Sequence, residues 1–319
     1  GLLEPLIQCN TCILLRFKEK DLGALQHFAL VKRYKEFMII NDLSDFDYKN
    51  KPLLKPVTVK WAKDSQIQSL NVVQNAYGFA SIFNSTFPFQ FLLRLHVKMA
   101  HHEILTLNEH LSKCSQLKSL IIIDLGSVSN WLTKTAATLT TLVMLRVIKI
   151  ETTIREEDAA VIRDISSYLP KSVEQVTLSF KIGDEKAKLQ TQNMEFFDSI
   201  FSIASLKHIG LILKDTGTHQ PVWKEEDLIY IHTKLKKMVA LKSLELQVCV
   251  NTLSYTTLKR FSDSLNNMLV LGDSVKIEIK VLDEKFNANQ AQEWMKLLRL
   301  SSYSMYIAKK KCVLKYLPD

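Results

Sequence analysis

The chain has 319 residues, 47% of them hydrophobic, which is ample for a large continuous core. Its net charge of +9 favours an acidic protein, nucleic acid or an anionic surface as partner, or simply belongs to a basic soluble protein. Only 8 Gly disfavour folds that cradle phosphates on glycine-rich loops, and no apolar run approaches the roughly 20 residues that span a bilayer.

One apolar spacing recurs in chain order and predicts the strands. Residues 12–17 read as a short buried strand. Afterwards three apolar residues stand at positions i, i+3 and i+5, as in Leu117-x-x-Leu120-x-Ile122. The same pattern starts at residues 34, 67, 92, 117, 145, 173, 206 and 241, and a further strand holds Ile277 and Ile279. The end of the chain, residues 304–317, is expected to be a final strand or cap.

The segments between these strands show apolar residues at helical spacing. We expect helices over residues 20–33, 104–111, 128–139, 161–169, 196–200, 228–238, 258–268 and 288–299. Pro170 should end the helix before it, because its ring has no backbone donor. Residues 42–60 read as a polar insertion, and the Phe-rich residues 75–90 as an irregular connection.

The spacing between successive units indicates a repeat architecture. Counted from Phe37 through Ile277, the middle apolar residues lie 33, 25, 25, 28, 28, 33, 35 and 33 residues apart. That length suits a strand followed by a helix that crosses back, so neighbouring strands should run parallel. Over residues 10–317 the chain resembles a leucine-rich-repeat protein of the long, helix-bearing type, similar to ribonuclease-inhibitor-like or F-box-associated repeats.

The resemblance implies an α/β fold with a curved parallel sheet on the concave face and helices on the convex face. It implies one solenoid over residues 1–319, with about ten degenerate repeats, terminal caps at 1–33 and 288–319 and the insertion at 42–60. The chain departs from the family after the strands. Asp124 and Thr152 stand near the place where the family usually has Asn or Cys.

Side chains alternate along a strand, so the residues between the buried anchors should line the concave face. Several of these are aliphatic, and an apolar patch on a surface marks either a contact site or a surface that residues 42–60 cover. The predicted partner-binding residues are Met38, Arg94, His96, Lys98, Ile121, Ile123, Val147, Lys149 and His208.

Motifs that would carry chemistry are weak. Cys9-x-x-Cys12 is a lone pair, and His101-His102-Glu103 lacks the spacing of a zinc helix. The acidic runs 156–158 and 225–227 stand at expected helix starts, where negative charge stabilises the helix dipole. Five thinly spread Cys favour a reducing compartment, cytoplasmic or nuclear. We therefore expect no enzyme, no cofactor and no metal.

The densest basic run lies near the end of the chain, at Lys309, Lys310, Lys311 and Lys315. It suits phosphate binding, or a charged outer edge of a capping strand. The sequence as a whole favours a non-catalytic protein–protein interaction scaffold whose partner is a protein, plausibly acidic, within a larger complex. The alternatives are the substrate receptor of an F-box type ubiquitin ligase and a nucleic-acid or ribonucleoprotein subunit.

Overall fold

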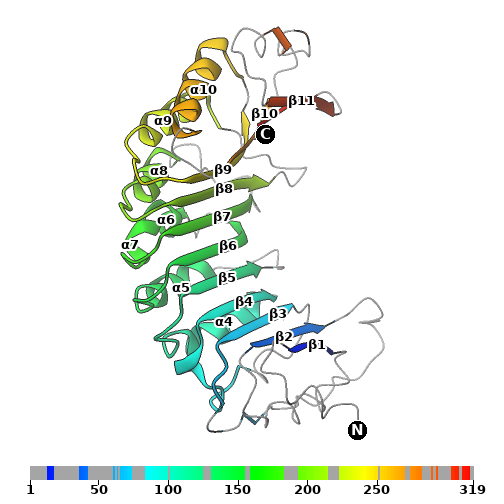
Figure 1. Ribbon diagram of the computed structural model, residues 1–319, viewed down its shortest axis with the longest axis vertical. Helices are drawn as coiled ribbons and strands as arrows, with labels where there is room; N and C mark the ends of the chain where they lie inside the picture. The colour runs from blue at the N-terminus through cyan, green and yellow to red at the C-terminus, as the bar shows by residue number, and fades with distance from the viewer. Residues whose placement is uncertain are drawn as a thin grey trace. The chain divides into compact units, whose positions relative to one another are not determined.

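The computed structural model divides into two compact units, unit 1 (residues 1–150) and unit 2 (residues 151–319) (Figure 1). It describes residues 13–17, 36–41, 60, 61, 63, 65–73, 83–99, 101–124, 131–154, 159–182, 193–214, 223–250, 252–269, 274–281, 289, 292, 293, 303–308 and 311–316. Whether the two units form one continuous solenoid stays a prediction.

Unit 1 contains a parallel sheet in which each strand pairs with the next along the chain. Its strands are β1 (Ile13–Phe17), β2 (Glu36–Asn41), β3 (Ser69–Val73), β4 (Arg94–Met99) and β5 (Ser119–Asp124), all paired in parallel. The strand β6 (Val147–Ile154) begins in this unit. Its helices are the 3-10 helix η2 (Phe89–Phe91), α4 (His101–Leu111) and α5 (Trp131–Leu139). The predicted parallel strands are confirmed here.

Unit 2 continues the alternation of helix and parallel strand. Its parallel strands are β7 (Gln175–Ile182), β8 (His208–Lys214), β9 (Ser243–Val250) and β10 (Ser274–Val281). Its helices are α6 (Ala159–Arg163), α7 (Ile165–Tyr168), α8 (Asn193–Phe201), α9 (Glu225–Leu235) and α10 (Tyr255–Leu269). The helix expected over 161–169 is therefore two short helices that break at Asp164.

The end of the chain reverses the direction of the sheet. The strand β12 (Lys311–Tyr316) pairs antiparallel with β10, and β11 (Tyr303–Ala308) pairs antiparallel with β12. Only residues 309 and 310 separate β11 from β12. So short a connection makes a hairpin, because a parallel pair needs a crossover of about a dozen residues or more. The expected final strand or cap is thus a hairpin.

The same backbone contact recurs where successive strands begin. One carbonyl oxygen accepts hydrogen bonds from two successive N–H groups of the next strand's start, at 2.7 to 3.1 Å. In unit 1 the accepting carbonyls belong to Gln68, Leu93 and Lys118, and in unit 2 to Glu174 and Lys207. This recurrence supports reading the chain as repeats of one structural motif, because β4, β5, β6, β8 and β9 are each joined to the preceding strand in the same way.

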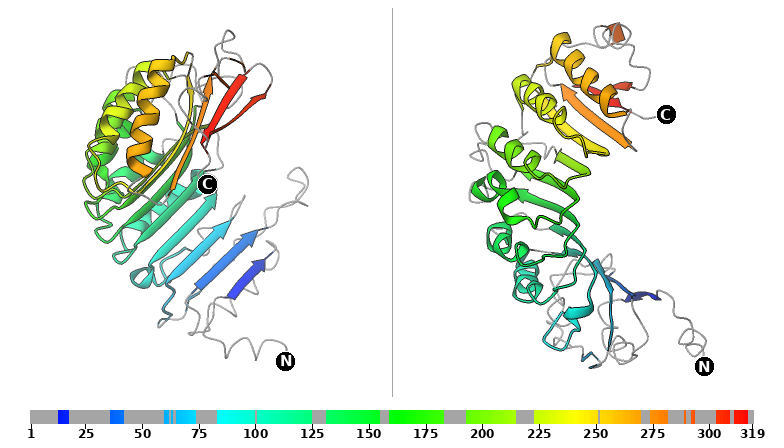
Figure 2. Two further views of the ribbon diagram at one scale, coloured as in Figure 1. Left: turned by 45° about the horizontal axis from the view of Figure 1, so that its top comes forward. Right: turned by 60° about the vertical axis from the view of Figure 1, so that its left-hand side comes forward.

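The apolar anchors form the core on one face of the strands. In the repeat that contains β5, the anchors Leu117, Leu120 and Ile122 are fully buried. Ahead of β4, the described part of the Phe-rich connection forms turns and the helix η2, as expected for an irregular segment. Phe83 packs there against Phe87 and Phe89, with ring centroids 4.9 and 4.7 Å away. Figure 2 shows the helices of each unit lying on one side of its strands.

The opposite side, here called the open face, carries the residues between the anchors. Along β5 and β6 buried and partly exposed residues alternate strictly, which confirms the predicted alternation. Two residues of this face, Ser179 and Gly210, are nevertheless buried. Gly210 is buried because Thr177 lies over it. A Cβ atom added to Gly210 would stand 2.8 Å from Thr177 Cγ2.

Several predictions fall outside the described residues, among them the helix at 20–33, the insertion at 42–60, and most of the last helix at 288–299. The acidic run 156–158 and the Cys9–Cys12 pair also fall there. Within the described part of the chain, every helix is too short or too polar to pass through a bilayer.

Candidate functional site

Three neighbouring strands of unit 1 bring most of the predicted partner-binding residues together. His96 of β4 is the direct neighbour of Ile121 of β5, and Lys98 is the neighbour of Ile123. The backbone N–H of Val147 bonds to Lys118 O, which sets the start of β6 beside β5. All seven residues are partly or fully exposed on the open face. We call this set the cationic patch: Arg94, His96, Lys98, Ile121, Ile123, Val147 and Lys149.

Two further predicted residues lie elsewhere. Met38 of β2 is the backbone neighbour of Asn71 of β3, and Asn71 is the neighbour of His96. Met38 therefore stands in the same cross-strand row as His96 and Ile121. His208 is in unit 2, where its neighbours are Gln175 and Ser243. It is not part of the cationic patch.

The electrostatic environment of His96 shows how closely the patch is assembled. Its pKa is lowered, first by burial and then by the positive charges of Lys149 and Lys98. Lys149 stands on β6 with β5 between it and His96, so the patch is close enough for charges on different strands to act on one ring. The imidazole is consequently neutral at neutral pH.

Two polar atoms at the edge of the patch lack hydrogen bonds. Asn71 Oδ1 and His96 Nε2 are both buried and have no partner. They belong to neighbouring residues of one row. A buried polar atom without a partner costs about 1–3 kcal/mol, so such atoms usually mark a place that a ligand, a water or another side chain completes. Asn71 was not among the predicted site residues, because only the strand register makes it the neighbour of His96.

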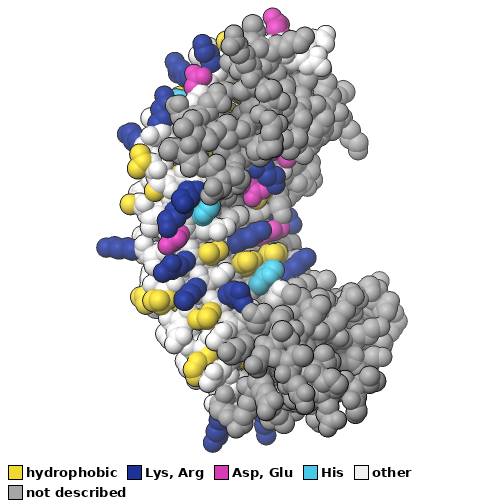
Figure 3. All heavy atoms as spheres, viewed as in Figure 1, with side chains coloured by type: hydrophobic (Ala, Val, Ile, Leu, Met, Phe, Trp, Pro, Cys, Tyr) yellow, Lys and Arg dark blue, Asp and Glu magenta, His cyan; other side chains and the backbone are white. Residues whose placement is uncertain are grey.

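Two of the positive charges in the patch, those of Lys98 and Lys149, have no acidic partner among the described residues. In unit 2, by contrast, Lys276 Nζ lies 2.6 Å from Glu245 Oε1 and Lys207 Nζ lies 3.0 Å from Glu174 Oε2. Figure 3 shows Lys and Arg side chains interspersed with hydrophobic ones on the face turned to the viewer. The open face of β4 to β6 is thus both positive and partly apolar.

The remaining predicted features lie in helices and strands where they are described, and phosphate binding by the basic run stays a prediction. Glu225, Glu226 and Asp227 form the first turn of α9, and Asp227 Oδ2 accepts a hydrogen bond from the N–H of Lys224 at 2.8 Å. His101 begins α4. Lys311 and Lys315 belong to β12, whereas residues 309 and 310 lie outside the described part. Among described residues, no group of three or more His, Cys, Asp and Glu could hold a metal ion.

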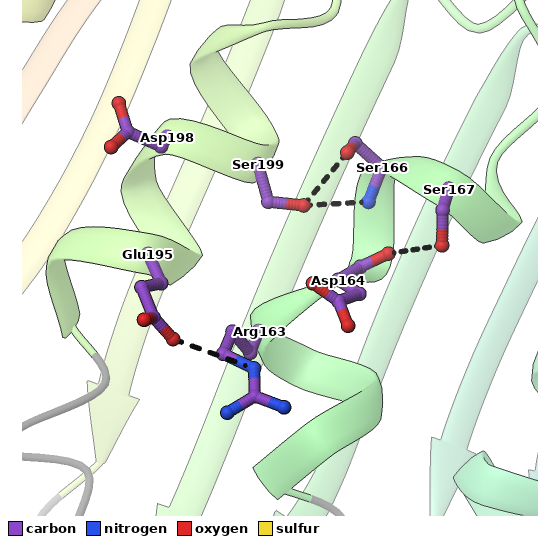
Figure 4. A pocket seen from close by; sticks show the side chains of 7 residues that line it. All are labelled: Arg163, Asp164, Ser166, Ser167, Glu195, Asp198 and Ser199. Atoms are coloured by element: carbon purple, nitrogen blue, oxygen red, sulfur yellow. Dashed lines mark hydrogen bonds and ion pairs between the residues drawn. The ribbon is translucent and has the colours of Figure 1, made fainter.

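A pocket that the sequence did not indicate lies on the helices of unit 2, with a volume of about 680 Å³ (Figure 4). Ser199 Oγ donates to Ser166 Oγ at 2.8 Å and accepts from Ser166 N–H at 2.9 Å. Glu195 pairs with Arg163 at 3.4 Å. Sequence reasoning missed it because the break at Asp164, which shapes one wall, was not foreseen. The lining also includes the carboxylates of Asp164 and Asp198.

Comparison with known proteins does not identify a family for this chain. No protein-family model matches the chain, and no curated protein matches its sequence. The described structure is an α/β arrangement in which helices alternate with parallel strands in chain order. Function must therefore be argued from the cationic patch itself.

Proposed function

We propose that this chain is a non-catalytic interaction scaffold of the leucine-rich-repeat type, which binds an acidic segment of a protein partner on the cationic patch. The observation that carries the proposal is the pair of unpaired lysines, Lys98 and Lys149, set beside partly exposed aliphatic side chains. A stable monomer has no need of such a surface, because unpaired positive charges repel one another and exposed apolar area is costly.

The patch contains both elements of a protein-binding surface. Ile121, Ile123 and Val147 offer apolar area that a partner buries, which supplies affinity. The surrounding cations select a partner with negative charge and speed its approach. Recurring parallel strands and the shared backbone contact at their starts support the repeat architecture on which this surface lies.

Nucleic-acid binding is the second candidate, favoured by the same cations and the net charge of +9. Proteins that bind single strands usually stack bases on aromatic rings. The cationic patch carries aliphatic residues between its charges, which suits a polypeptide better. The substrate-receptor function follows from the sequence resemblance alone and stays a prediction.

The test is affinity capture from the native source with chemical cross-linking to map the contacts. Wild type should cross-link to an acidic segment at β4 to β6, and the double variant Lys98→Glu/Lys149→Glu should lose that partner. Lys134→Glu, a charge reversal at an exposed position of α5, serves as the matched control and should retain it. A partner held equally by the double variant would refute the proposal.

Oligonucleotide binding separates the two candidates. A nucleic-acid protein should lose affinity steeply between about 50 and 200 mM salt, because each phosphate contact releases a counterion. Tight, salt-sensitive binding of RNA or DNA that the double variant abolishes would favour the second candidate over the first.

A further inference from the structure

The ring of His96 has two different edges. Its Nε2 atom is buried without a hydrogen-bond partner, yet the side chain as a whole is partly exposed. One edge therefore faces inward and the other faces solvent on the open face. The inward edge lies in the row of Asn71, whose buried Oδ1 also lacks a partner.

A neutral imidazole carries one proton, and its place follows from these surroundings. Asn71 Oδ1 can only accept a hydrogen bond, so the neighbouring buried acceptor favours the proton on Nε2. Nδ1 is then a bare acceptor. It repels the carboxylate oxygens of an acidic partner, whereas a protonated ring would offer them an N–H donor.

Burial, followed by the positive charges of Lys149 and Lys98, explains why the unbound ring does not hold the second proton. Lys149 on β6 and Lys98 on its own strand both disfavour a positive ring, and Arg94 lies on the same strand as His96. The adjacent open-face residues of β3 and β5 are Asn71 and Ile121, which carry no charge. A carboxylate placed among these groups would cancel the repulsion from the lysines and accept the ring's new donor.

We propose that His96 is the specificity residue of the cationic patch, and that binding of a partner's Asp or Glu carboxylate there is coupled to uptake of one proton by the ring. Asn71 stands next to His96 in the same cross-strand row, and the protonated ring donates to the carboxylate. The inference rests on the proposed function, and it makes the recognition of acidic segments stronger in mildly acidic conditions.

The direction in which pH changes the affinity follows from the pKa of His96 in the free protein and in the complex. Burial and the lysines hold the pKa of His96 below 6.5 in the free protein. The bound carboxylate raises that pKa, so the complex holds more protons than its free components between the two values. Affinity therefore rises as the pH falls through this window, by up to about tenfold per pH unit, and levels off below the free-state pKa.

The experiment measures binding of a short synthetic peptide of Glu and Leu, by calorimetry from about pH 8 to about pH 5 in buffers of different ionisation enthalpy. Wild type should take up close to one proton on binding, and NMR titration should show the His96 pKa rising in the complex. The same peptide with Gln in place of Glu should show no proton uptake.

Three variants isolate the role of the ring. His96→Gln should bind without proton uptake, and His96→Lys, which carries a fixed charge, should bind at high pH as tightly as wild type does at low pH. His110→Gln, which removes a titratable ring from α4, should leave proton uptake unchanged. Wild-type binding without proton uptake, or uptake that persists in His96→Gln, overturns the inference and leaves the scaffold proposal standing. Failure of wild type to bind the acidic peptide at every pH overturns both.

Discussion

Cys114 follows α4 and shows how burial decides the chemistry of a single side chain. It is fully buried, and burial raises the pKa of its thiol to about 12. Only the thiolate reacts with electrophiles, so a thiol of this pKa is inert at neutral pH. Cys114 and Cys249 are both buried, which fits a role in packing the core.

The first prediction concerns this thiol. At about pH 8 roughly one Cys114 in ten thousand is a thiolate, so iodoacetamide should label it far more slowly than an exposed cysteine. Mass spectrometry of the native protein checks this, with urea-unfolded protein as the reference in which Cys114 reacts normally. Rapid labelling of native Cys114 would contradict the burial described here.

The second prediction concerns the close contact at Gly210. Gly210→Ala adds a Cβ atom 2.8 Å from Thr177 Cγ2, so we expect the free energy of unfolding to fall by about 1–3 kcal/mol. Chemical denaturation measures the change. Thr177→Ala removes the nearest atoms, and in that background the cost of Gly210→Ala should be clearly smaller. Equal costs in both backgrounds would show that the contact is not the cause.

At the scale of elements, the strands were the easiest part to predict. The anchors of each strand are buried whatever the neighbouring repeat does, so their spacing marks the strand directly, as Leu117, Leu120 and Ile122 do for β5. The break at Asp164 and the hairpin of β11 with β12 were missed, because local spacing does not show where a helix is interrupted or which way a last strand turns.

The candidate site was only partly predictable for a related reason. The alternation along strands identified Lys98, Ile121 and Lys149 as open-face residues. It did not show that Lys98 and Lys149 lack ion pairs, or that Asn71 sits beside His96. These facts depend on the register between strands that lie far apart in the sequence. The sequence of one strand does not show that register.

The third prediction tests how neighbouring helices are joined. Ser254 precedes α10, and its hydroxyl oxygen accepts a hydrogen bond from Thr257 N–H at 3.2 Å. Its own N–H donates to Glu225 Oε1 of α9 at 3.0 Å, and its hydroxyl donates to the same carboxylate. Ser254→Ala removes the cap and the hydroxyl bond to Glu225, and it keeps the bond from the backbone N–H of residue 254.

We expect Ser254→Ala to lower the free energy of unfolding by about 1–2 kcal/mol, in line with the loss of a helix N-cap. Thr256→Ala, at an exposed position of the same turn, is the control and should change stability by less than about 0.5 kcal/mol. Denaturant titration compares the two. A loss no larger than that of the control would remove the capping role.

At the scale of the whole molecule, the chain separates into two compact units, and the boundary falls within β6. In a chain built of repeats each unit contacts mainly its neighbours, so stability is a sum of local terms. The sequence predicted the repeats but not this division, because the spacing of anchors is similar on both sides of residue 150.

The fourth prediction follows from this division. Leu120→Ala leaves a cavity in the core of unit 1 and should cost about 2–5 kcal/mol there. Hydrogen exchange read by mass spectrometry should quicken in β3 to β5 much more than in β7 to β9. Equal acceleration in both units would show that they unfold as one cooperative body.

The carbonyl oxygen that accepts two hydrogen bonds at the start of β4, β5, β6, β8 and β9 has a consequence for sequence variation. The bonds from Arg146 N–H and Val147 N–H to Lys118 O involve only main-chain groups, so they do not depend on which side chains those positions carry. Open-face residues such as Ser119 and Val147 can therefore be substituted without breaking the backbone hydrogen bonds that join neighbouring strands. Binding specificity could change through substitutions at these surface positions alone. The same tolerance of substitution would lower the sequence similarity between distant relatives.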